Sequence, residues 1–261
     1  MFLLTAVPLW VLGVLLIGGG ALAGAAGLYL VRRWFKNPPF EANDVAGFIY
    51  TNLGVVYAVL LAFIVIVVWQ AFTEAERNAA EESAILIALY RDTAVYPEPQ
   101  RQLLRGKLRA YTAVVVEDEW RTMAQGQASL KARAALGELW SAYLGHPPDT
   151  LAEAVLYTEA SRRLNDMSTQ RTLRILAAGS GLSPILWLML AAGGAVMIGS
   201  SYLFASRSLV SHALFCGLLA GLVAASLLVI LALDHPFTGD VRVSPESFTH
   251  ALDVFENRAA Q

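Results

Sequence analysis

Four long stretches without a charged side chain are the dominant feature of this sequence. The first covers residues 7–31, which form a helix long enough to cross a hydrocarbon core of about 30 Å at ~1.5 Å per residue. The others cover residues 45–72, 184–205 and 209–233. Soluble domains rarely contain such runs. They therefore predict an all-α integral membrane protein with four transmembrane helices.

The composition agrees with a lipid environment and excludes one class of partner. The mean hydropathy is +0.52, and 56% of the residues are hydrophobic. The 19 basic residues are matched by 21 acidic ones, so there is no dense basic surface for phosphate groups. We therefore expect the lipid bilayer as a partner and no nucleic acid. The single cysteine, Cys216, lies in the fourth stretch and is expected to pack as a small hydrophobic residue.

The first stretch has an alternative interpretation as a cleaved signal peptide, because residues 23–25 read Ala-Gly-Ala, like a cleavage site. A transmembrane helix is favoured for three reasons. The run is long, no basic residue precedes it, and Arg32, Arg33 and Lys36 follow it directly.

Short loops rich in basic residues usually stay in the cytoplasm, which gives an expected orientation. The loop after the first stretch is basic, and Arg207 lies between the third and fourth stretches. If these loops are cytoplasmic, the amino terminus, the soluble domain and the tail lie on the extracytoplasmic side. Arg171 and Arg174, just before the third stretch, favour the opposite orientation.

Nearly all of the charge lies between the second and third stretches. Residues 73–182 contain 13 of the 19 basic and 14 of the 21 acidic residues, which predicts a water-soluble part. The expected organisation is two transmembrane helices in residues 1–72, a soluble helical bundle in 73–182, a transmembrane hairpin in 183–233, and a tail in 234–261 that packs on the soluble domain.

Helix boundaries in this charged segment follow from proline positions and apolar spacing. No proline occurs between Pro39 and Pro97, so one helix is expected from about residue 40 through the second stretch to about residue 95. Further helices are predicted over residues 103–115 and 130–144, and from about residue 150 toward the third stretch. Four helices with short connections predict a bundle.

Two clusters of titratable residues are interpreted as structural. The acidic run at residues 117–119 is expected to be a solvated helix face, with Trp120 on the opposite side. Asp234 and His235, with Asp240, could bind a cation or sense pH, but a turn capping the last membrane helix is favoured. The histidines lack metal-ligand spacing and no enzyme motif occurs, so neither a metal, a cofactor nor an enzymatic activity is expected.

The second stretch has polar residues at a spacing that places them on one face. Eleven residues make about three helical turns and eighteen make about five, so widely separated residues align. The candidate pore-lining residues are Glu41, Asn52, Phe63, Ile66, Gln70 and Glu74. In this interpretation the two glutamates concentrate cations at the mouths, and Phe63 and Ile66 form an apolar constriction. The alternative is that Asn52 bonds to a neighbouring helix and the glutamates lie at the two interfaces.

Small residues recur every four positions in the fourth stretch, at Ala213, Gly217, Gly221 and Ala225. A similar pattern occurs in the first stretch. Such stripes allow close helix packing, either within one subunit or between subunits.

Three segments together resemble one family. They are residues 47–69 with Asn52 and Gly54, residues 171–174 leading to Pro184-Ile185-Leu186-Trp187, and the closing motif Leu233-Asp234-His235-Pro236-Phe237-Thr238-Gly239 with Val243-Ser244-Pro245. The similarity extends from about residue 27 to residue 255. The sequence resembles the bacterial DUF4239 family of bestrophin-like integral membrane proteins. The most distinctive part is the closing tail motif, at Asp234, His235, Pro236, Phe237 and Gly239.

The resemblance implies a homo-oligomeric channel for small ions in the bacterial inner (cytoplasmic) membrane, with a pentamer as one candidate and the second helix lining the pore. Four helices alone hardly enclose a water-filled path, so several copies around an axis are needed. The alternative function is a membrane-anchored sensor or scaffold whose soluble helical bundle binds a ligand or partner.

Overall fold

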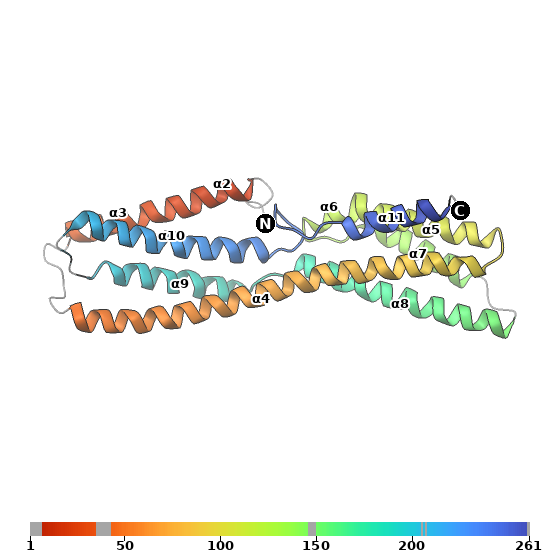
Figure 1. Ribbon diagram of the computed structural model, residues 1–261, viewed down its shortest axis with the longest axis horizontal. Helices are drawn as coiled ribbons and strands as arrows, with labels where there is room; N and C mark the ends of the chain where they lie inside the picture. The colour runs from red at the N-terminus through yellow and green to blue at the C-terminus, as the bar shows by residue number, and fades with distance from the viewer. Residues whose placement is uncertain (1–6, 35–42, 146–149, 205, 207, 260–261) are drawn as a thin grey trace.

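The protein is an elongated, all-helical molecule. The computed structural model describes residues 7–34, 43–145, 150–204, 206 and 208–259. One helix, α4, runs along almost the whole length, and the other helices form two groups that lie end to end against it (Figure 1). The described residues contain no β-strand. The predicted all-α fold is therefore confirmed.

The first group contains the apolar helices, and we call it the membrane half. It consists of α2 (Leu9–Gly13), a π-helical turn η1 (Val14–Gly18), α3 (Gly19–Trp34), α9 (Pro184–Ser201), α10 (Leu209–Leu233) and the first part of α4, residues 43–72. Four helices here are long and apolar enough to cross a membrane, beginning at Leu9, Val45, Pro184 and Leu209. This agrees with the four predicted spans.

Helix α4 (Asn43–Asp92) joins the two groups as one unbroken element of 50 residues. At ~1.5 Å per residue it is about 75 Å long. A 3₁₀ turn, η2 (Thr93–Val95), ends it, and Tyr96 is extended because the following Pro97 disfavours helical geometry. The observed end matches the predicted end near residue 95.

The second group, which we call the charged half, comprises residues 73–92 of α4 and the helices that surround them. These are α5 (Gln100–Val114), the π-helical turn η3 (Val115–Glu119), α6 (Trp120–Met123), α7 (Leu130–Leu144), α8 (Leu151–Gly179) and α11 (Glu246–Ala259). Ser129 and Thr150 cap α7 and α8, each through a side-chain oxygen that accepts a backbone N–H. Large buried side chains such as Tyr90, Phe248 and Phe255 fill a common core.

In the membrane half, glycines allow α3 and α10 to approach each other closely. A Cβ built on Gly24 of α3 would lie 2.6 Å from the Cβ of Ala220 and 2.8 Å from the carbonyl oxygen of Cys216, both on α10. A Cβ on Gly217 would lie 3.0 Å from the carbonyl oxygen of Ala21. The small-residue stripes of the first and fourth spans therefore pack against each other within one subunit.

Candidate functional site

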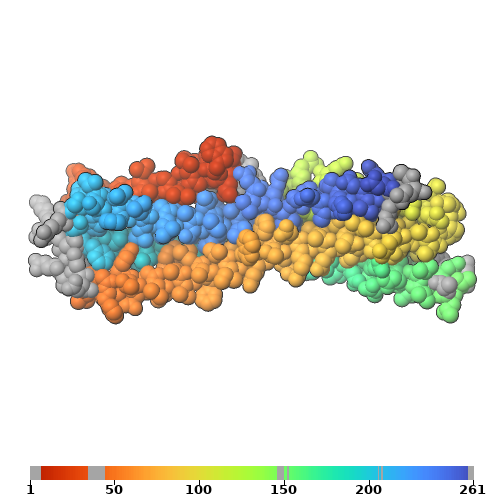
Figure 2. Space-filling model, in the orientation of Figure 1, coloured from red at the N-terminus to blue at the C-terminus, as the bar shows by residue number. Residues whose placement is uncertain are grey.

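One face of α4 is left uncovered by the described helices of the same chain. In the membrane half α4 contacts α9 and α10 through the opposite face, where Tyr57, Ile64 and Val68 are buried. The space-filling view shows the side chains of α4 exposed along one edge of the molecule (Figure 2). The candidate pore-lining residues that the structure describes are all exposed, namely Asn52, Phe63, Ile66, Gln70 and Glu74. Glu41 lies outside the described residues.

Asn52 bonds to its own helix, not to a neighbouring one. Its Nδ2 donates to the carbonyl oxygen of Phe48 at 2.8 Å, one turn earlier in α4. The adjacent Thr51 hydroxyl likewise donates to the carbonyl oxygen of Gly47 at 2.9 Å. The Asn52 side chain nevertheless remains exposed. Because an amide facing lipid is costly, this face of α4 must meet either protein or water within the membrane.

Just beyond the membrane half, on the same side of α4, Glu74 belongs to a charged group whose other members, Arg77 and Glu81, the sequence interpretation did not single out. The Arg77 Nη2 donates to both carboxylate oxygens of Glu74, at 2.6 and 2.5 Å. The Arg77 Nε also lies 3.8 Å from Glu81 Oε1. An open groove of about 410 Å³ is lined by Gln70, Glu74 and Arg77. The three- and four-residue spacing of these charges is the sequence signal that could have revealed the pairs.

A second polar feature lies inside the charged half, where four charged side chains are buried together. Arg174 Nε donates to Glu82 Oε2 at 2.8 Å, and Arg174 Nη2 donates to Glu119 Oε2 at 2.9 Å. Arg171 Nη2 donates to the other oxygen of Glu119 at 2.5 Å. Glu82 comes from α4, Glu119 from η3 and both arginines from α8. We call these four residues the buried charge cluster; it links three elements of the charged half.

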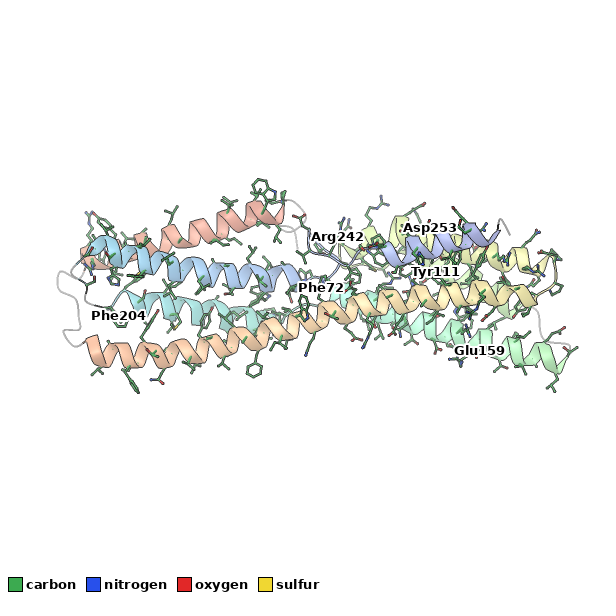
Figure 3. All side chains as sticks on the ribbon, in the orientation of Figure 1. Phe72, Tyr111, Glu159, Phe204, Arg242 and Asp253 are labelled. Atoms are coloured by element: carbon green, nitrogen blue, oxygen red, sulfur yellow. The ribbon has the colours of Figure 1, made fainter. Side chains whose placement is uncertain are left out.

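Aromatic groups complete the surroundings of the buried charge cluster. The Tyr111 hydroxyl donates to Glu82 Oε1 at 2.6 Å, and Figure 3 shows Tyr111 on the inner side of the charged half. Burial, followed by the negative charge of Glu82, raises the pKa of Tyr111 well above its usual range. Burial alone would lower the pKa of Arg174, but the charges of Glu82 and Glu119 outweigh that effect and raise it. The cluster therefore pairs two carboxylates with two guanidinium groups.

The interpretation of residues 117–119 as a solvated face is wrong for Glu119, whose side chain is fully buried. The π-helical turn η3 directs Glu119 and Trp120 inward, while Glu117 is exposed. Burial of this carboxylate is possible because both Arg171 and Arg174 neutralise it.

The tail motif forms a compact turn between the two halves, and we call residues 234–243 the tail clasp. Asp234 Oδ1 accepts the backbone N–H of Leu182 at 2.6 Å, and Oδ2 accepts the indole N–H of Trp187 at 3.4 Å. The Asp234 carboxylate therefore binds the start of α9, not the end of α10. His235 Nδ1 lies 2.9 Å from the carbonyl oxygen of Asp234. No group of three metal-ligating residues occurs in the described part of the chain.

The rest of the tail clasp packs against α6. Phe237 is buried with its ring against Trp120, at 5.8 Å between centroids. The carbonyl oxygen of Pro236 accepts the N–H of Val243 at 2.7 Å, and the carbonyl of Val243 accepts the Trp120 indole N–H. Gly239 has φ 82°, which favours glycine at this turn. The clasp thus connects the end of α10 to both halves.

These features define a class: an all-helical membrane protein with one exposed polar face on its longest helix. A family model described as a Bestrophin-like domain matches residues 18–248. The chain therefore belongs to the bestrophin-like family. Its narrower assignment to DUF4239 remains a prediction.

Solved structures share this fold. Two single-residue variants of a bacterial bestrophin homolog from Klebsiella pneumoniae match with a TM-score of 0.71, at 13% and 11% sequence identity. Each match covers 95% of this chain and 99% of the solved one. A structure described as a membrane protein variant also has a TM-score of 0.71 at 13% identity, with the same coverage. No curated protein matches the chain.

Proposed function

We propose that the protein is a homo-oligomeric channel for small ions in the bacterial inner membrane, with the exposed face of α4 lining the pore. The observation that carries the proposal is the uncovered face itself, since Asn52 and Gln70 are exposed within a helix of membrane-spanning length. Water in a pore would solvate these amides at no cost, whereas lipid would not. Membership of the bestrophin-like family supports the same assignment.

Several subunits are needed because α4 presents only one such face per chain. Cyclic symmetry would bring the α4 helices together around a common axis. Five copies are one candidate number. In that arrangement Phe63 and Ile66, which are 64% and 50% exposed, would form apolar rings that constrict the path.

The test is conductance of the purified protein in planar bilayers, after its oligomeric state has been measured by light scattering in detergent. Phe63→Ala should widen the constriction and raise the single-channel conductance severalfold. Phe215→Ala is the matched control, since Phe215 is also exposed, at 68%, but lies on α10. A folded oligomer without current would overturn the channel and favour the alternative of an anchored sensor or scaffold.

The expected orientation places the charged half outside the cytoplasm, and thiol labelling tests it. Cys216 is the single cysteine of the sequence, so a Cys216→Ala background gives a protein without cysteine. Asp253→Cys reports on the charged half and Ser206→Cys on the opposite end, because both positions are exposed. An impermeant reagent should label Asp253→Cys in spheroplasts. Labelling of Ser206→Cys instead would reverse the orientation.

A further inference from the structure

The charged residues that follow the proposed pore on α4 form one connected unit. Gln70, Glu74, Arg77 and Glu81 succeed one another at three- or four-residue spacing, so they continue the exposed face of the helix. Their charged side chains remain accessible, with 62% of Arg77, 50% of Glu74 and 48% of Glu81 exposed. Ions leaving or entering along this face would meet all three charges.

Arg77 joins the two carboxylates of this unit. It holds both oxygens of Glu74 and lies 3.8 Å from Glu81. The second oxygen of Glu81 accepts a hydrogen bond from Nε2 of Gln170, on α8, at 2.8 Å. Glu74 is therefore paired with Arg77, and each subunit carries two negative charges and one positive charge here.

We propose that Arg77 is a selectivity-determining residue, and that the net charge of the Glu74–Arg77–Glu81 unit, not Glu74 alone, sets the preference between small cations and anions. The inference rests on the proposed channel function. With a net charge of −1 per subunit, the wild-type protein prefers small cations only modestly. Arg77 limits that preference because its guanidinium lies among the carboxylates that attract cations.

A charge series tests this in planar bilayers under a potassium chloride gradient, with reversal potential as the measurement. Arg77→Gln leaves −2 per subunit and should raise the cation-to-anion permeability ratio, because one unit charge a few ångströms away changes the local concentration of each ion by about fivefold, in opposite directions. Glu74→Gln leaves zero and should lower the ratio by a similar factor. Glu74→Gln with Glu81→Gln leaves +1 and should make the channel prefer anions.

The decisive variant is the double substitution Glu74→Gln with Arg77→Gln. Its net charge equals that of the wild type, so its permeability ratio should return to the wild-type value. If Glu74 alone set selectivity, the double variant would behave like Glu74→Gln. Arg77→Lys keeps the charge and should keep the ratio. Differences within the series should shrink at 1 M salt, where the Debye length is about 3 Å.

A matched control lies on α8, where Arg162 pairs with Glu159 and Asp166 at the same spacing. Arg162→Gln should leave the reversal potential unchanged, because this triad does not continue the exposed face of α4. Currents whose reversal potential is insensitive to Arg77→Gln would overturn the inference and leave the channel intact. Absence of current in the folded wild-type oligomer would overturn the proposed function itself.

Discussion

The two halves of this molecule are held together by different means. In the membrane half, α3 approaches α10 so closely that a single added carbon on Gly24 would overlap Ala220. Likewise, a Cβ on Gly193 of α9 would lie 2.6 Å from the Tyr57 ring of α4. In the charged half, large aromatic side chains fill the core and a balanced set of charges is buried among them.

This difference is expected for chains packed in two solvents. Lipid tails are as apolar as leucine side chains, so helices in a bilayer gain little from apolar burial and depend on close van der Waals contact. Helices surrounded by water gain from burying large apolar groups. A buried ion pair adds little net stability, but losing one partner leaves an uncompensated charge. The same kind of substitution should therefore have different effects in the two halves.

The largest expected effect is from Arg174→Met in the buried charge cluster. It leaves Glu82 without a cationic partner and removes one of the two that neutralise Glu119. The free energy of unfolding should fall by about 3–5 kcal/mol. Urea unfolding of the detergent-solubilised protein, followed by near-ultraviolet circular dichroism, measures it.

Two further variants separate the buried charge from simple loss of packing. Arg174→Met with Glu82→Leu leaves the balanced pair Arg171–Glu119 and should regain part of the stability. The exposed Arg162→Met should leave the free energy of unfolding close to that of the wild type, because solvent screens this pair. Equal losses for Arg174→Met and Arg162→Met would contradict the comparison between buried and exposed charges.

In the membrane half the matching substitution is Gly24→Leu, which forces α3 away from α10. Overpacking of a close helix contact should cost on the order of 3 kcal/mol. Gly19→Leu in the same helix is the control, since nothing lies within 4 Å of a Cβ built on Gly19. Thermal unfolding in detergent should show a lower midpoint for Gly24→Leu only. A similar loss in both variants would mean that composition, not close approach, limits this helix.

A pair of tyrosine substitutions compares polar contacts in the two halves directly. Tyr111→Phe removes a donor to the buried carboxylate of Glu82 and should cost about 2 kcal/mol. Tyr57→Phe removes a 3.1 Å bond to the carbonyl oxygen of Leu190 within the membrane half and should cost about 0.6 kcal/mol. The same unfolding assay measures both. A larger loss for Tyr57→Phe would reverse the expected ranking.

The smallest effect concerns the exposed pairs of α8 and depends on pH. Hydrogen bonds from Arg162, then Arg163, lower the pKa of Glu159 from 4.5 to about 2. The ionised pair therefore contributes stability above pH 4.5, and this contribution is lost as the pH falls from 4.5 through 2. Glu159→Gln should flatten this part of the acid dependence, measured by unfolding at pH 6 and pH 2.5. An unchanged pH profile would show that solvent screens the pair completely.

The parts of this structure that follow from local sequence were predictable. The absence of proline between Pro39 and Pro97 indicated one long helix, and it is observed from Asn43 to Asp92. The four uncharged runs indicated the four apolar helices. These features depend on residues close in sequence, and their physical causes, such as missing backbone donors at proline, act locally.

The buried features were not predictable because their partners are remote in sequence. Arg171 lies 52 residues from Glu119, and Arg174 lies 92 residues from Glu82. An acidic residue in a charged run is interpreted as solvated from the sequence alone, and only the fold shows which distant arginine neutralises it. Asp234 was recognised as part of a motif, but its bond to the N–H of Leu182 is equally remote.

Because α4 is continuous, its helical periodicity fixes the rotation of one half of the molecule relative to the other about the helix axis. Each residue turns an α-helix by about 100°, so one residue inserted between Phe72 and Ala75 would swing the exposed face relative to the buried charge cluster by that angle. Seven inserted residues, about two full turns, would nearly restore the alignment while lengthening the rod by ~10 Å. The number of residues in this connecting segment is thus constrained in steps of whole turns, and conductance across such an insertion series should rise and fall with the helical period.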